Sequence, residues 1–175
     1  MLGQAHSEGL TQLHCKVSVA KVTKCHQIRW DAAYPSPMES VRVERGSAIC
    51  EYSYRAGQMF GRVYGPVTTA THRLICVDVV RLSRRWVVRS VAIDYRWAVI
   101  LMPFEDLNAT PDHVPQDVMQ RPAALILPAP SLSMFREYAW AQAMRGVIRG
   151  AFLDLDRGRD WADAKAKCRT PASAR

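Results

Sequence analysis

The side chains best suited to chemistry form a group of arginines around one tryptophan, between residues 81 and 96. A guanidinium stays charged, binds phosphate or carboxylate through two parallel hydrogen bonds, and stacks on aromatic rings. The group comprises Arg81, Arg84, Arg85, Trp86, Arg89 and Arg96. Cations beside a ring on which a base can stack are the components of a nucleic-acid-binding surface. We therefore expect contacts with the backbone of DNA or RNA. Solvated arginines around a core tryptophan are the alternative interpretation.

Three more arginines extend this expectation. Arg62 lies in a glycine-containing segment and would add to a basic face, while Arg145 and Arg149 are one turn apart in an expected helix and would project together. The expected binding residues are thus Arg62, Arg81, Arg84, Arg85, Trp86, Arg89, Arg96, Arg145 and Arg149. The same basic surface would suit an acidic face of another protein or of a nucleic-acid-processing complex. A small accessory, adaptor or inhibitor protein is therefore the alternative function.

Catalytic chemistry is less favoured. His72, Cys76 and Asp78 share one face of an expected strand. A cysteine becomes a nucleophile when a histidine lies within hydrogen-bonding reach. Four residues along a strand span about 13 Å, so His72 and Cys76 would not touch. His113, from another segment, could complete a site, but nothing in the spacing demands it. We predict no catalytic residues and do not favour an enzyme.

Four residues near the N-terminus have the side chains of a zinc site. His14, Cys15, Cys25 and His26 are placed symmetrically about Ala20, and a hairpin centred there would bring four potential ligands together. The centre lacks a turn-forming residue, and neighbouring side chains on a strand point to opposite faces. Ordinary thiols and imidazoles explain the residues better. We predict neither a metal nor another cofactor.

The charge of the chain points to acidic partners. Its 175 residues include 24 Lys and Arg against 16 Asp and Glu, for a net charge of +8. Residues 1–103 carry +7, residues 104–133 carry −3 and residues 134–175 carry +4. A hydrophobic fraction of 49% with 23% charged residues excludes a wholly disordered chain. The expected partners are a nucleic acid or an acidic protein surface, within a larger complex.

The cysteines and the N-terminus suggest a cytoplasmic protein. Five cysteines, spread widely and odd in number, do not resemble a secreted disulfide framework. Residues 1–8 have neither a basic stretch nor an apolar stretch, so we expect no signal peptide. The most apolar run, residues 97–102, is too short to cross a bilayer. We therefore expect no membrane partner.

Alternating apolar residues over residues 12–102 predict the body that would position these side chains. We expect an antiparallel, β-rich body of about six or seven strands, arranged as a sheet, a sandwich or a barrel. Its clearest part is a long strand over residues 72–82, a turn at residues 83–85 and a returning strand over residues 86–93. A further turn at residues 94–96 would lead into the next strand. This hairpin would present the arginine group at its tip.

The rest of the chain is expected to be a connector and a helix. Six prolines interrupt residues 103–133, where residues 123–127 form either a short strand or packed coil. Residues 134–168 are expected to be helical, with the apolar face of residues 140–155 packed on the sheet. Residues 1–11 and 169–175 are expected to be loose tails. The fold class predicted is a single α+β domain.

Overall fold

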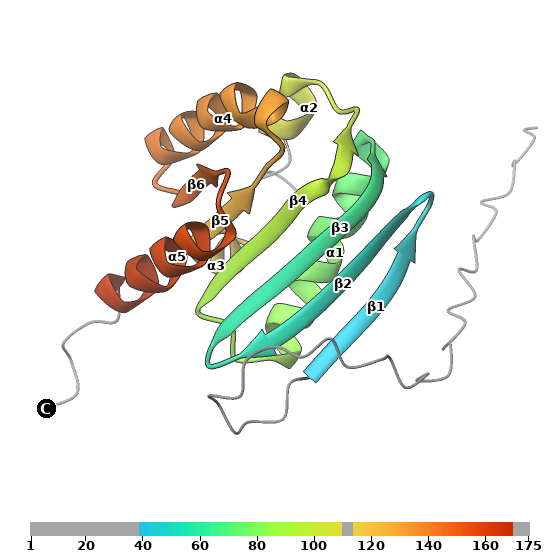
Figure 1. Ribbon diagram of the computed structural model, residues 1–175. Helices are drawn as coiled ribbons and strands as arrows, with labels where there is room; N and C mark the ends of the chain where they lie inside the picture. The colour runs from blue at the N-terminus through green and yellow to red at the C-terminus, as the bar shows by residue number, and fades with distance from the viewer. Residues whose placement is uncertain (1–38, 110–113, 170–175) are drawn as a thin grey trace, which may run out of the picture. The chain divides into compact units, whose positions relative to one another are not determined.

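The computed structural model describes residues 39–109 and 114–169 (Figure 1). The expected tail at residues 1–11, the histidine–cysteine group of His14, Cys15, Cys25 and His26, and His113 lie outside the described residues. The same is true of residues 170–175 at the C-terminus.

A single six-stranded sheet organises the described residues, with the strands side by side in the order in which they occur in the chain. The strands are β1 (Glu39–Arg45), β2 (Ala48–Arg55), β3 (Gln58–Val67), β4 (Ser90–Ile100), β5 (Ala123–Ile126) and β6 (Arg149–Phe152). The helices are α1 (Thr69–Arg85), α2 (Phe104–Ala109), α3 (Gln116–Met119), the 3-10 turn η2 (Ala129–Ser131), α4 (Leu132–Met144) and α5 (Leu155–Arg169).

The sheet is mixed, which makes the predicted antiparallel β-rich body wrong. β1, β2 and β3 pair antiparallel, as meander strands do, but β3, β4, β5 and β6 all run parallel. Parallel neighbours need crossover connections, and here helices supply them. The described residues therefore form an α/β fold in which helices cover a mixed sheet, and not the expected sandwich or barrel.

The antiparallel part follows directly from local sequence. Buried and partly exposed residues alternate along β2 and β3. The turn between them places Ala56 at φ 50° and Gly57 at φ 87°, both in the left-handed region. Two such residues in a row match the twist of a tight hairpin. This hairpin fixes the register in which Tyr52 lies opposite Gly61.

The segment expected as the longest strand is instead the first crossover helix, α1. Thr68 caps it, because the Thr68 hydroxyl accepts a hydrogen bond from the backbone N–H of Thr71 at 3.3 Å. Its buried residues His72, Ile75 and Leu82 follow the helical repeat, not the alternation of a strand. The turn expected at residues 83–85 is the last turn of this helix. The turn expected at residues 94–96 is a β-bulge inside β4, where the register with β3 shifts.

The C-terminal part also differs from the prediction. Residues 134–168, all expected to be helical, are divided into α4, β6 and α5. Trp140 is 70% exposed, so the expected apolar face does not lie on the sheet as a unit. The proline-rich connector holds α2, α3 and β5, and β5 realises the short-strand alternative for residues 123–127.

The helices divide between the two faces of the sheet. One core cluster joins α1, α2 and α4 to one face, through residues such as Ile75, Leu107 and Phe135. A second, smaller cluster joins α5 to the other face, where Ala162 meets Ala124 and Ile126. Figure 1 shows α1 behind the sheet and α5 in front of it. α1 is thus a surface helix whose inner side faces the larger core.

Candidate functional site

The outward side of α1 carries a stripe of two valines between two arginines. Arg73, Val77, Val80 and Arg84 are separated by four, three and four residues, so they lie along one face of the helix. They line a surface groove of about 660 Å³, together with Cys76, Arg81 and Pro115. Among the described residues, its lining contains three arginines and no aspartate or glutamate. We call this feature the α1 groove.

Two arginines beside the stripe are held by acidic residues. Asp78 is buried and accepts hydrogen bonds from Arg45 Nε at 2.8 Å and from Arg81 Nη2 at 3.2 Å. Arg85 forms an ion pair with Glu39 of β1. In the sequence, Asp78 was grouped with His72 and Cys76 as a possible catalytic residue. In the structure it links α1 to Arg45 of β1. Among residues 39–109 and 114–169, Arg73 and Arg84 have no ion-pair partner.

Solvent-exposed apolar side chains lie beside these cations. Val77 is 60% exposed and Leu74 is 44% exposed. Exposed aliphatic residues on a helix, next to arginines, form a surface that is both apolar and positively charged. Such a surface matches a partner that combines apolar side chains with carboxylates.

The expected stacking residue, Trp86, is not on the surface. It is 4% exposed, and its ring stacks on Tyr54 with centroids 5.6 Å apart. Its position after the last residue of α1 turns the ring towards the core. Arg89, also in the expected set, donates from Nη2 to the carbonyl oxygen of Ala56 at 2.6 Å. The core-tryptophan alternative is thus what the structure has.

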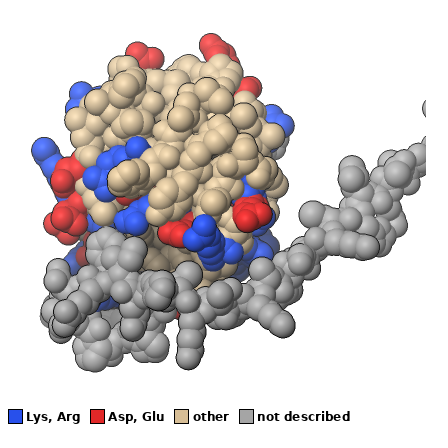
Figure 2. Space-filling model, turned by 45° about the vertical axis from the view of Figure 1, so that its right-hand side comes forward, with Lys and Arg blue, Asp and Glu red and all other residues tan. Residues whose placement is uncertain are grey.

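Two further expected residues lie on the other face of the sheet. Asp94, fully buried in β4, accepts hydrogen bonds from Arg96 Nε at 3.0 Å and Arg96 Nη2 at 2.9 Å. Arg62 Nε lies 3.8 Å from the same carboxylate. In Figure 2, the coloured residues on the face in view show small neighbouring groups of blue and red, not one continuous basic patch. Because both guanidiniums are held at Asp94, on the face of the sheet away from α1, Arg62 and Arg96 are separated from the arginines of α1.

The last pair of the expected set is divided between two elements. Arg145 is the exposed C-cap residue of α4. Arg149 is not on a helix: it is the first residue of β6, and its side chain enters a cavity beneath α1. The two side chains therefore do not project together. We expected them to project together because we placed both on one helix. That expectation was wrong because α4 ends at Met144.

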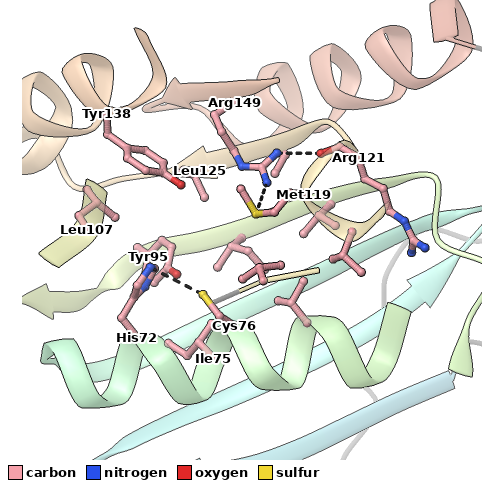
Figure 3. Close-up of a pocket in the computed structure, with 16 residues that line it drawn as sticks. His72, Ile75, Cys76, Tyr95, Leu107, Met119, Arg121, Leu125, Tyr138 and Arg149 are labelled. Carbon is pink, nitrogen blue, oxygen red and sulfur yellow. Dashed lines mark hydrogen bonds between the residues drawn. The ribbon is translucent and has the colours of Figure 1, made fainter. Parts of the chain in front are cut away.

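His72 and Cys76 are in contact, contrary to the expectation for a strand. On α1 they are one turn apart, and Cys76 Sγ lies 3.8 Å from His72 Nε2 (Figure 3). Burial lowers the pKa of His72 to about 4 and raises the pKa of Cys76 to about 12. A thiolate nucleophile needs the opposite shift of the thiol pKa. At neutral pH both groups are uncharged, so the pair lacks the electrostatics of an activated cysteine.

The described residues also bear on metals and membranes. Within residues 39–109 and 114–169, no group of three or more His, Cys, Asp or Glu side chains is placed to hold a metal ion. The histidine–cysteine group near the N-terminus lies outside these residues. No helix in the described ranges has the length and apolarity needed to span a bilayer.

Sequence reasoning missed Arg73, Val77 and Val80, which complete the α1 groove. Read as a helix, residues 69–85 would have shown them, because residues 73, 77, 80 and 84 fall on one helical stripe. The signal was therefore present, but the strand interpretation concealed it.

Comparisons with known proteins give little further guidance. No protein-family model matches the chain, and no curated protein does. The chain is similar to an uncharacterized protein of the DUF3478 family, with a SpoIIAA-like fold, from Shewanella loihica PV-4. That crystal structure aligns with 71% of this chain and 93% of its own chain, at 10% identity and a TM-score of 0.40. At this score the likeness carries no argument about function.

Proposed function

We propose that the chain is a non-catalytic binding module that holds an acidic, partly apolar segment of another protein in the α1 groove. The observation that carries this proposal is the stripe of Arg73, Val77, Val80 and Arg84 in a groove where none of the lining residues that the structure describes is acidic. Carboxylates of the partner would pair with the two terminal arginines. Its apolar side chains would cover Val77 and Val80 between them.

The positions of the other expected residues favour a protein partner over a nucleic acid. A single strand bound through stacking needs an accessible ring beside its cations, and Trp86 is buried. A duplex bound through phosphates needs several cations along one track, and Arg62 and Arg96 lie on the opposite face around Asp94. The α1 groove alone is short and partly apolar, which suits a peptide segment better.

The test is a selection of displayed random peptides against the full chain. The stripe from Arg73 to Arg84 is about 17 Å long at about 1.5 Å per residue, so peptides of about 12 residues cover it. We expect the selected peptides to be rich in Asp and Glu interspersed with Leu, Ile or Phe. Affinity is then measured by fluorescence anisotropy over a series of salt concentrations.

Matched variants locate the binding. The double variant Arg73→Gln, Arg84→Gln should weaken the selected peptides about tenfold or more, or about 1.4 kcal/mol. The control Arg136→Gln, Arg157→Gln removes the same charge from exposed positions elsewhere and should change affinity less than about twofold. Val77→Asp should also weaken binding.

Three results would overturn the proposal. The first is a selection that yields no acidic peptides. The second is an equal loss in the two double variants. The third is tighter binding of DNA or RNA of about 20 nucleotides than of any peptide, with a steep salt dependence that the groove variant flattens. That outcome would establish the nucleic-acid interpretation instead.

A further inference from the structure

A second cavity lies on the inner side of α1, between this helix and the parallel strands. Its volume is about 80 Å³. Its walls are mostly apolar and include Ile75, Val91, Ile93, Leu107 and Leu125. The polar residues that line it are few: His72, Cys76, Tyr95, Arg121, Tyr138 and Arg149 (Figure 3). The Arg121 guanidinium is held elsewhere, by the carbonyl oxygen of Ser83 and the carboxylate of Asp117. An apolar cavity with a few convergent polar groups is the usual form of a small-molecule site.

Arg149 brings a positive charge into this cavity without a negative charge to match it. Its Nη1 donates to the carbonyl oxygens of Arg121 at 2.8 Å and Ile148 at 2.9 Å. Its Nη2 donates to the sulfur of Met119, at 3.3 Å, and a thioether is a weak acceptor. In the part of the chain that the structure describes, no aspartate or glutamate pairs with this guanidinium.

The surroundings of this charge compensate it poorly. Burial lowers the pKa of Arg149, while the phenol of Tyr138 is the first group that acts against this effect. Burial also raises the pKa of Tyr138, so at neutral pH the phenol is uncharged and offers a dipole only. A guanidinium in an apolar setting is costly unless an anion pairs with it.

His72 supplies an independent observation at the opposite wall. The residue is only 7% exposed, and its Nδ1 is buried without a hydrogen-bond partner. Its other ring nitrogen faces Cys76 Sγ. Buried polar atoms in folded proteins nearly always have a partner, so an unpartnered imidazole nitrogen in a cavity indicates a missing acceptor or donor.

We propose that this cavity binds a small monocarboxylate, with the acid group on Arg149 and the hydrocarbon part against the apolar wall. A carboxylate can accept two parallel hydrogen bonds from a guanidinium, which a halide cannot do. The unpartnered nitrogen of His72 provides a further polar contact across the cavity. This site is separate from the α1 groove and does not depend on the function proposed for it.

The volume limits the length of the ligand. A dry cavity of about 150 Å³ accommodates benzene, so about half that volume holds roughly three to five heavy atoms. Acetate and propionate fit this range, and longer chains do not. Ligands of this size bind at most weakly, and a dissociation constant of about 1 mM is the expected order.

The experiment titrates the full chain, labelled with 15N, with sodium propionate and follows the backbone amide resonances by NMR. Propionamide has the same shape without the charge, sodium nitrate has the charge without the hydrocarbon, and octanoate exceeds the volume. We expect saturable shifts for propionate, centred on His72, Cys76, Tyr138 and Arg149. The other three compounds should bind at least about tenfold more weakly.

Variants separate the guanidinium from its surroundings. Arg149→Met should abolish saturation, and Arg149→Lys should keep part of the affinity, because the charge remains and the fork is lost. Arg136→Met, at an exposed position of α4, should bind propionate like the wild type. If Arg149→Met fails to fold, the titrations of the wild-type chain with the four compounds test the proposal by themselves.

Two results would overturn the proposal of a carboxylate site. One is the absence of saturable shifts, or shifts of equal size for propionate and propionamide. The other is a set of shifts centred on Arg73 and Arg84, which would place the anion in the α1 groove. Conversely, failure of the peptide selection leaves propionate binding at Arg149 untouched, so the two proposals fail separately.

Discussion

At the scale of single residues, the structure separates charged groups with equal formal charge into different environments. Arg73 and Arg84 are exposed on α1, Arg96 is held by the buried carboxylate of Asp94, and Arg149 lies partly buried in a cavity. Only the first two remain available to a large partner. Net charge therefore predicted the sign of a partner's charge but not which arginines are accessible to it.

His72 should make the stability of the protein depend on pH in a defined window. Burial lowers its pKa in the folded state to about 4 from the ordinary value of 6.5. As pH falls from 6.5 towards 4, the unfolded state takes up a proton that the folded state does not, so stability decreases. Between pH 7 and pH 5 this contribution is about 2 kcal/mol.

The comparison variant is His72→Gln, which stays neutral throughout. Urea denaturation at pH 7 and pH 5 should show a smaller loss of unfolding free energy for the variant than for the wild type. The other titratable groups are present in both proteins, so they cancel in the difference. Equal losses in the two proteins would mean that His72 is protonated in the folded state at pH 5.

At the scale of elements, Gly158 allows α5 to lie close to the sheet. A Cβ atom on Gly158 would lie 3.2 Å from Cγ1 of Ile126 and 3.3 Å from Cδ2 of Phe152. Gly158→Leu should therefore push α5 from β5 and β6 and destabilise the fold by about 1–3 kcal/mol, although leucine favours helices.

The matched control for this substitution lies on the same helix. Ala164 is exposed, and Ala164→Leu adds comparable volume without meeting the sheet. In urea denaturation, the free energy of unfolding should fall for Gly158→Leu. For Ala164→Leu it should stay within about 0.5 kcal/mol of the wild-type value. If both variants were equally stable, the close packing of α5 would not matter to the fold.

The elements also show what could be predicted from the sequence. β1, β2 and β3 were recognisable because each alternates apolar and polar residues and ends at a turn. α1 was misread because Val77, Val79 and Val80 favour strands by type, whereas its buried residues follow a helical repeat. The four residues of β6 have no periodicity that distinguishes them from the end of a helix.

The same limit applies to the sites. Exposed arginines such as Arg84 could be proposed from residue type alone. The cavity could not, because it depends on β6 pairing with β5, which places Arg149 across the cavity from His72. Pairings of this kind join residues far apart in the sequence, and no local pattern encodes them.

At the scale of the whole molecule, α4 completes a core that begins in the N-terminal half. Phe135 is fully buried, and its ring lies 6.2 Å from that of Tyr95 in β4, measured between centroids. Phe135→Ala should cost about 3–5 kcal/mol. Trp140→Ala, on the same helix, removes a ring that is 70% exposed and should cost less than about 1 kcal/mol. Thermal denaturation of the two variants measures the difference, and equal losses would contradict a core that depends on α4.

The strongest consequence of this shared core concerns a fragment of residues 1–133. It lacks Phe135 and Tyr138, and it leaves β5 without β6 as a neighbour. Since Tyr95 then loses the ring against which it packs, the fragment should show no cooperative thermal transition by circular dichroism and poorly dispersed NMR spectra. A fragment that unfolds cooperatively, with the same midpoint as the full chain, would show that α4, β6 and α5 form an accessory unit rather than part of the core.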